Sequence, residues 1–168
     1  VYIRERDPGD LFEKLLPYFL EAGLMADRDD PNTRILREAI PLVQERLKYL
    51  SDAPAMMRYL LEEPELPEPE EFIAKKMDLE KTVGVLEAAL GFGDDILGGK
   101  LEEAELEAFA RRKAEELEIK LGGLLMPLRV AVTGSRVSPP LFGSMRLIGA
   151  EATRQRLERA LKHLQKKG

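Results

Sequence analysis

Apolar residues recur at intervals of three and four along nearly the whole chain of 168 residues, with charged residues between them. This spacing places apolar side chains on one face of an α-helix, so it predicts an all-α fold. Helix-starting Ser, Asp and Pro and helix-ending Gly divide the pattern into separate elements. The predicted helices span residues 7–23, 30–50, 53–61, 70–90, 101–118, 120–132, 138–148 and 150–167, and the pattern of 70–90 also allows a break near Asp78.

Local signals mark the ends and interiors of several predicted helices. Asp7 is the expected N-cap of the first helix, and Pro8 suits its first turn. Pro41 lies inside the second helix and should bend it, because proline has no N–H to donate. Ser138 and Pro139 repeat the cap-then-proline signal near the C-terminus, so we expect Ser138 to cap a short helix.

The segment EEPELPEPEE, residues 62–71, interrupts the helical pattern. Its glutamates and prolines cannot bury a core, so we interpret it as a solvated connector or a boundary between subdomains. The chain is long enough for two small helical subdomains that share its length. The sequence therefore predicts an N-terminal subdomain over residues 1–62 and a C-terminal subdomain over residues 63–168.

Glycines mark two further places. The loop GFGDDILGGK, residues 91–100, offers two acids where a phosphate would sit, and no Gly-Lys-Ser/Thr follows it. We therefore interpret it as a turn between helices rather than a phosphate cradle. Gly122 and Gly123 weaken a predicted helix by about 1 kcal/mol each relative to alanine. Close core packing and close approach by a ligand are both possible reasons for them.

Composition removes several classes of function. The chain has no cysteine and one histidine, His163, so it lacks the residues for disulfides, thiolate zinc sites and Ser-His-Asp triads. We interpret His163 as a solvated residue in a basic helix end and expect no metal site. No apolar run approaches the roughly 20 residues that span a bilayer, and the first residues are too charged for a signal peptide. We expect a cytoplasmic location.

Charge is unevenly distributed along the chain. The net charge is -5, but residues 120–168 carry ten Lys and Arg against two Glu, a balance of +8, which leaves -13 for residues 1–119. A basic end on an acidic body suits a nucleic-acid partner, because phosphates respond to local charge. An ordinary basic C-terminal helix without a partner fits the same charge pattern equally well.

The motifs near the C-terminus occur in a fixed order: PLRVAVTG at 127–134, SPPLF at 138–142, LIG at 147–149 and RQRLERAL at 154–161. In this order they resemble the C-terminal, anticodon-binding part of bacterial glutamyl-tRNA synthetases. YIR at 2–4, LFEKLLPYFLEAGL at 11–24 and ILREAIPLVQERLKYLSDAPAMMRYLL at 35–61 are similar to the family's preceding segments. Since the chain begins at Val1, the resemblance favours a fragment of a longer protein.

The resemblance implies that both subdomains bind the anticodon of a transfer RNA. Arg46 corresponds to an arginine that in this family checks the third anticodon base, cytosine for glutamate against guanine for glutamine. A guanidinium can donate to the O2 and N3 acceptors of cytosine. Gln44 is a nearby polar candidate, and Arg46 could instead be an ordinary arginine on a helix surface.

In the C-terminal subdomain, Arg129, Ser138 and Leu141 match positions that contact the anticodon in the family. Arg129 is the single charge in the apolar run LLMPLRVAV, so it needs an exposed face, an acidic partner or RNA. Ser138 could equally be a plain helix cap, and Leu141 could belong to the core. On charge alone, the candidates for phosphate contacts are Arg136, Arg146 and Arg154.

The resemblance also limits what this chain can do alone. Nothing in it resembles the H-I-G-H or K-M-S-K-S motifs of a class I synthetase, so we expect no catalytic residues and no cofactor here. ATP and Mg²⁺ would be used by a catalytic domain of the parent glutamate-tRNA ligase. We expect tRNA(Glu) as the partner, no DNA or membrane partner, and a monomer. The alternative is a helical protein-interaction module that does not bind RNA.

Overall fold

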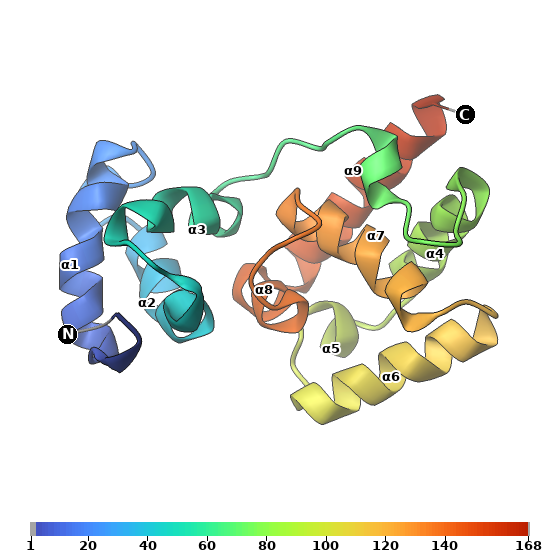
Figure 1. The fold of residues 1–168 in the computed structure, drawn as a ribbon, viewed down its shortest axis with the longest axis horizontal. Helices are drawn as coiled ribbons and strands as arrows, with labels where there is room; N and C mark the ends of the chain where they lie inside the picture. Colours follow the sequence, from blue (N-terminus) through green and yellow to red (C-terminus); the bar gives the residue numbers. More distant parts are fainter. Residues whose placement is uncertain (1–2, 168) are drawn as a thin grey trace. The chain divides into compact units, whose positions relative to one another are not determined.

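The computed structural model of the chain describes residues 3–167, and Figure 1 shows these as helices joined by loops. The described residues contain no β-strand, which confirms the all-α prediction. The α-helices are α1 (Pro8–Glu21), α2 (Asn32–Val43), α3 (Ala53–Leu61), α4 (Leu79–Leu90), α5 (Asp94–Leu97), α6 (Glu103–Glu116), α7 (Leu121–Thr133), α8 (Leu141–Ile148) and α9 (Ala150–Lys167). Short 3₁₀ helices are η1 (Ile3–Glu5), η2 (Gln44–Arg46), η3 (Leu50–Asp52) and η4 (Pro69–Phe72).

Two compact units divide the chain, a first unit of residues 1–63 and a second unit of residues 64–168. In the first unit, α1 contacts both α2 and α3. The Asp7 carboxylate accepts hydrogen bonds from the amides of Gly9 and Asp10, so the predicted cap forms. The apolar faces of these helices build one core, whose fully buried members include Leu11, Leu15, Phe19, Leu36, Ile40 and Met57.

The second predicted helix is shorter than expected. It ends at Val43, and η2 follows at once, whereas the apolar pattern predicted a helix as far as Leu50. Pro41 removes one helical hydrogen bond within the last turn, which weakens the ladder there. The backbone is then extended at Leu47 and again at Tyr49, so residues 47–49 form a non-helical link between η2 and η3.

Helix α7 is the centre of the second unit. It contacts α4, α6, α8 and α9, and eight of its side chains or glycines are buried. Gly123 explains part of this packing, because a Cβ there would lie 3.0 Å from the Met77 sulfur, whereas Gly122 faces open space. The core around α7 includes Phe72, Leu86, Leu97, Leu106, Leu124, Leu157 and Leu164.

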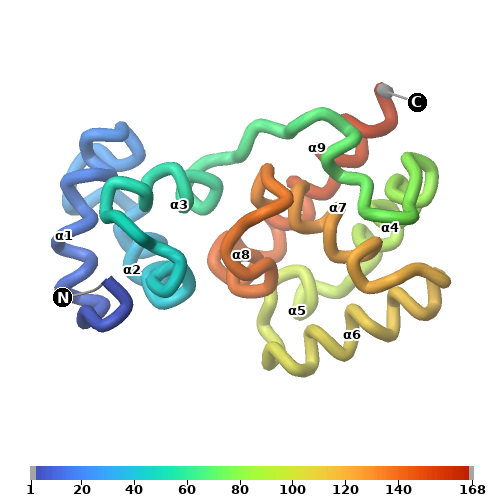
Figure 2. The backbone as a smooth tube through the Cα atoms, in the orientation of Figure 1, coloured from blue at the N-terminus to red at the C-terminus, as the bar shows by residue number. Residues whose placement is uncertain are grey.

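The glutamates of the segment 62–71 are exposed, as its composition indicated, and the division between the two units falls within it, but side chains of α9 also hold two of its carbonyls. Figure 2 shows residues 62–78 as a long trace that reaches α9 before α4 begins. The guanidinium of Arg159 donates to the carbonyl oxygen of Pro64 at 2.5 Å, and His163 Nε2 donates to that of Pro67 at 2.8 Å. Phe72 is fully buried. The prolines keep the segment extended, so its carbonyls stay available to these side chains.

Three further expectations need correction. His163 is half-buried against Phe72 and is not a solvated residue. Residues 70–78 of the predicted helix 70–90 do not belong to α4, which starts at the break allowed near Asp78, where the Asp78 carboxylate caps it by accepting from the amide of Lys81. The loop 91–100 contains α5 and packs on α9.

Candidate nucleic-acid interface

Arg46 is the last residue of η2, and its side chain is exposed. It makes no hydrogen bond or ion pair with another residue in the described part of the chain. Arg46 lies in a 3₁₀ turn rather than in the predicted helix, and it directly precedes the extended residue Leu47. A guanidinium placed in this way keeps its five N–H donors for a ligand or for water.

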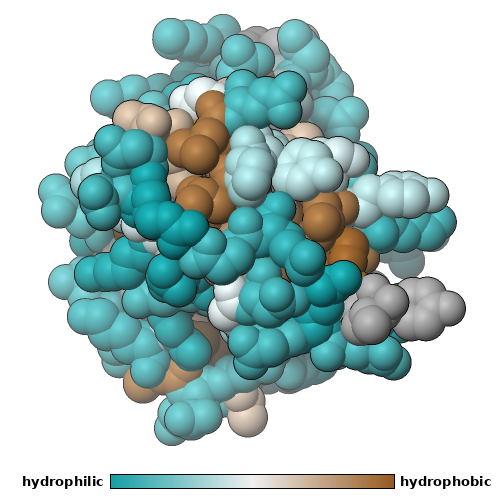
Figure 3. All heavy atoms as spheres, turned by 90° about the vertical axis from the view of Figure 1, so that its left-hand side faces the viewer, coloured by the Kyte–Doolittle hydropathy of each residue, from teal (hydrophilic) through white to brown (hydrophobic). Residues whose placement is uncertain are grey.

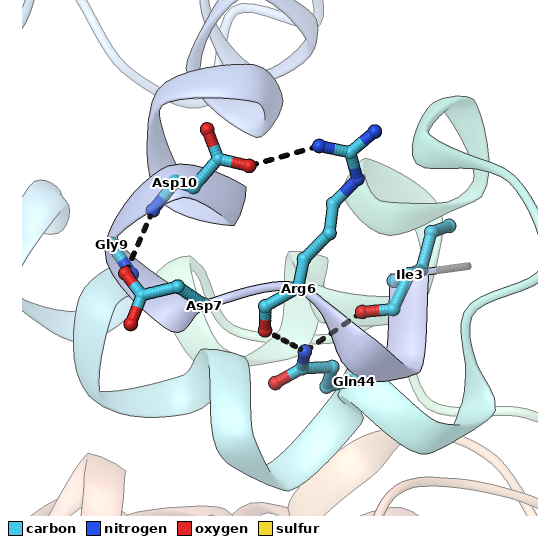
Figure 4. A network of polar contacts seen from close by, with 6 residues as sticks. All are labelled: Ile3, Arg6, Asp7, Gly9, Asp10 and Gln44. Carbon is cyan, nitrogen blue, oxygen red and sulfur yellow. Dashed lines mark hydrogen bonds and ion pairs between the residues drawn. The ribbon is translucent and has the colours of Figure 1, made fainter. Parts of the chain in front are cut away.

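Gln44 has a different role from the one that its proximity to Arg46 suggested. Its side chain is buried, and the amide nitrogen donates to the carbonyl oxygens of Ile3 at 2.8 Å and Arg6 at 2.7 Å (Figure 4). The carbonyl oxygen of Arg4 is further away, at 3.3 Å. These bonds attach η1 to the end of α2. The amide nitrogen is therefore committed to the fold.

A hollow of about 420 Å³ lies beside this attachment, between η1 and the link that follows Arg46. Its lining combines apolar side chains with charged ones of both signs. We call it the η1 hollow, and it is lined by Ile3, Arg4, Glu5, Leu47 and Lys48. Arg46 therefore directly precedes Leu47 and Lys48, two of the residues that line this hollow.

In the second unit, the structure brings two of the predicted site residues together. Arg129 Nη1 donates to the hydroxyl oxygen of Ser138 at 2.7 Å and to the carbonyl oxygen of Pro139 at 3.2 Å. The Ser138 hydroxyl in turn donates to the Pro139 carbonyl at 2.8 Å. Two of the contacts of the half-buried Arg129 are thus with neutral oxygens, which the sequence did not indicate.

Ser138 is therefore not the helix cap that we expected. Helix α8 begins three residues later, at Leu141, and its N-cap is Pro140. A residue before proline is held out of the helical region, and here two residues in succession precede a proline. Leu141 is 5% exposed and lies in the core, so its side chain offers a ligand little surface.

The three arginines chosen as phosphate contacts differ in how strongly they are already engaged. Arg146 donates to the carbonyl oxygens of Gly99 at 2.7 Å and Leu101 at 3.1 Å. Arg154 forms an ion pair of 2.8 Å with Asp94. Arg136 is exposed, on the loop between α7 and α8, and its ion pair with Glu71 is long, at 3.9 Å. Of the three, Arg136 can therefore turn toward a phosphate at the smallest cost.

Much of the positive charge of residues 120–168 supports the fold. Arg156 is 7% exposed and donates to the carbonyl oxygen of Val132 at 2.6 Å, and Arg159 holds Pro64. Among the side chains of α9 that the structure describes, the exposed cations are Lys162 and Lys166, which line a hollow of about 460 Å³. The charge pattern alone could not separate these two roles.

Two kinds of site are absent from residues 3–167. No three His, Asp or Glu side chains in this range lie close enough to hold a metal ion. No helix in the same range is long and apolar enough to cross a membrane. The mostly hydrophilic face in Figure 3 carries only small, separate hydrophobic areas.

The described residues form two all-α units, and the first of them carries the exposed Arg46. The chain belongs to the family of anticodon-binding domains, because the sequence model of that family, described as "Anticodon binding domain", matches residues 10–161. Among its relatives is a glutamate-tRNA ligase of Treponema denticola, which is 37% identical over 180 residues that cover 95% of this chain and 35% of that protein.

Other relatives agree in name and in coverage. A glutamate-tRNA ligase of Roseiflexus sp. is 39% identical over 167 residues, which cover 95% of this chain and 31% of that protein. The fold is similar to that of a glutamate tRNA ligase from Elizabethkingia meningosepticum, with a TM-score of 0.71 and 17% identity over 96% of this chain and 30% of that one. The chain thus spans about a third of the length of these relatives.

Proposed function

We propose that this chain binds the anticodon of tRNA(Glu) as part of a glutamate-tRNA ligase. The family match and the names of the relatives support this function. Attachment of glutamate, with ATP and Mg²⁺, would require a catalytic domain in addition to these residues. In this proposal the protein works as a monomer in the cytoplasm.

The observation that carries the proposal is the exposed guanidinium of Arg46, which has no hydrogen bond or ion pair to any other described residue. The bases of an anticodon loop are unpaired, so a protein can read their Watson–Crick edges. Cytosine presents two acceptors, O2 and N3, which match the paired donors of a guanidinium. Guanine presents an N–H donor at the equivalent place, so it would leave Arg46 with a donor facing a donor.

The second unit would supply a further contact through the Ser138–Pro139 corner that Arg129 braces. Ser138 is 9% exposed and Leu141 is 5% exposed, so the contacts would come from this corner and its backbone more than from the two side chains. Exposed Arg136, on the same loop, would meet a phosphate. Salt would weaken such a contact, because phosphate neutralisation releases bound counterions.

The test compares two arginine variants in gel-shift titrations with tRNA(Glu) and tRNA(Gln) at low and moderate salt. Arg46→Gln should narrow the preference for tRNA(Glu) by about 1 to 3 kcal/mol, the usual value of one bidentate contact. Arg34→Gln is the matched control, because Arg34 is also an exposed arginine of the first unit and its pair with Glu38 is a loose 3.7 Å.

Two results would decide against the proposal. Equal, negligible binding of both tRNAs by the unmodified chain would favour a helical protein-interaction module instead. Unchanged discrimination by Arg46→Gln would show that another residue reads the third base.

A further inference from the structure

Tyr49 is an aromatic side chain that the fold does not use. It is 67% exposed, and it is the one aromatic among the large apolar side chains that lie exposed within residues 3–167. In contrast, Tyr59 on α3 is 6% exposed. Tyr49 makes no side-chain hydrogen bond with another described residue, so its hydroxyl has no partner among them.

The backbone presents this ring from a short link. Residues 47–49 join η2 to η3 without helical structure, and Tyr49 is extended, with φ -126° and ψ 145°. Leu47 anchors the start of the link in the core, where it is 5% exposed. The ring therefore stands on a support that is fixed at both ends, by Leu47 and by η3.

Charged groups surround the link. Arg46 and Lys48 are both exposed and lie three positions and one position before Tyr49. Lys48 and Arg4 line the η1 hollow, in which Glu5 is the one acid. An exposed aromatic ring flanked by cations is the combination by which proteins hold single-stranded nucleic acid, because the ring stacks on a base while the cations meet phosphates.

We propose that Tyr49 is a stacking platform for an unpaired RNA base, next to the base read by Arg46. The inference rests on the proposed anticodon function and adds a contact to it. Stacking acts on the face of a base and hydrogen bonding on its edge, so Tyr49 adds affinity while Arg46 adds discrimination. Arg46 ends η2 and Tyr49 ends the link that follows it, so the two side chains lie three positions apart in the same unit, which suits two consecutive bases of a loop.

The first test is the affinity for an RNA hairpin that carries the anticodon arm of tRNA(Glu). Tyr49→Ala should weaken binding about 5- to 150-fold, the range found when one stacking side chain is removed. Tyr49→Phe keeps the ring and should bind within about threefold of the unmodified chain. Because Tyr49 is exposed, both variants should unfold at the same temperature as the unmodified chain.

A second readout reports the contact directly. The chain contains no tryptophan, so Tyr49→Trp introduces a single indole whose fluorescence a stacked base quenches. Tyr18→Trp is the matched control, since Tyr18 is a half-buried tyrosine on α1 of the same unit. The hairpin should quench Trp at position 49 and leave Trp at position 18 nearly unchanged.

The outcomes separate this inference from the function beneath it. Failure of the unmodified chain to bind the hairpin would overturn the proposed function and, with it, the stacking contact. If the unmodified chain binds the hairpin and Tyr49→Ala binds it with the same affinity, the stacking contact alone is overturned. Equal losses in Tyr49→Ala and Tyr49→Phe would assign the contact to the hydroxyl, which also contradicts stacking.

Discussion

The attachment of η1 by Gln44 makes a prediction about stability. In Gln44→Leu the side chain keeps much of its volume but loses the amide that donates to Ile3 and Arg6 at 2.8 and 2.7 Å. The Arg6 amide still donates to the Ile3 carbonyl at 3.2 Å, so that oxygen keeps one partner. The Arg6 carbonyl loses the donor that Gln44 supplied.

The expected loss follows from these bonds. Two short hydrogen bonds contribute about 0.5 to 1.5 kcal/mol each, and the longer one to Arg4, at 3.3 Å, adds little. Gln44 is 8% exposed, so water replaces the amide poorly. We therefore expect Gln44→Leu to lower the free energy of unfolding of the first unit by about 1 to 3 kcal/mol.

The assay is urea unfolding, monitored through the NMR signals of the backbone amides in each unit separately, since the two units have their own cores. Gln155→Leu, at an exposed glutamine of α9, is the control for exchanging Gln with Leu and should change stability by less than about 0.5 kcal/mol. A Gln44→Leu variant as stable as the unmodified chain would refute the role given to the Gln44 amide.

Two further predictions concern packing and pH. In thermal unfolding, Gly122→Ala should raise the free energy of unfolding by up to about 1 kcal/mol, because the added Cβ enters open space. Gly123→Ala should raise it less or lower it, because the added Cβ meets the sulfur of Met77 at 3.0 Å. Hydrogen bonds from the amides of Ala26 and Asn32 hold the pKa of Asp30 below its ordinary 3.8. This stabilisation is complete above pH 3.8 and is lost as pH falls through the lower, folded value, so Asp30→Asn should lower the unfolding temperature near neutral pH and change it less in acid. If Asp30→Asn lowers the unfolding temperature equally near neutral pH and in acid, the stabilising role given to the Asp30 carboxylate is contradicted.

The parts of the fold that depend on local signals could be predicted from the sequence. The cap at Asp7, the periodic apolar face of α1 and the end of α3 at Leu61 depend on residues within a few positions of each other. The start of α4 after Asp78 was less clear, because the helical pattern continues upstream of it.

The parts that depend on contacts between distant residues could not be predicted. The carbonyls of 62–71 are held by Arg159 and His163, which lie about a hundred positions further along the chain. The pairing of Arg129 with Ser138 depends on the path of two prolines, so charge and apolar pattern gave no sign of it. Gln44 did carry a signal, because it continues the stripe of Leu36 and Ile40 at four-residue spacing.

The same distinction applies to the candidate interface. The family resemblance singled out Arg46 and the charge pattern the +8 C-terminal region, but neither could show that Arg146, Arg154 and Arg156 are engaged within the fold. Burial and partners are properties of the folded chain. The structure therefore moves the emphasis for RNA contact to side chains that remain exposed, among them Arg46 and Arg136.

The most direct test of the account is the affinity of the unmodified chain for two anticodon hairpins of tRNA(Glu). The hairpins differ in one base, cytosine or guanine at the third anticodon position, and the binding is read by amide shifts in an NMR titration. The account predicts tighter binding to the cytosine hairpin by about 1 to 3 kcal/mol, with the largest shifts around Arg46. Equal affinity for both hairpins, or shifts confined to residues remote from Arg46, would contradict it.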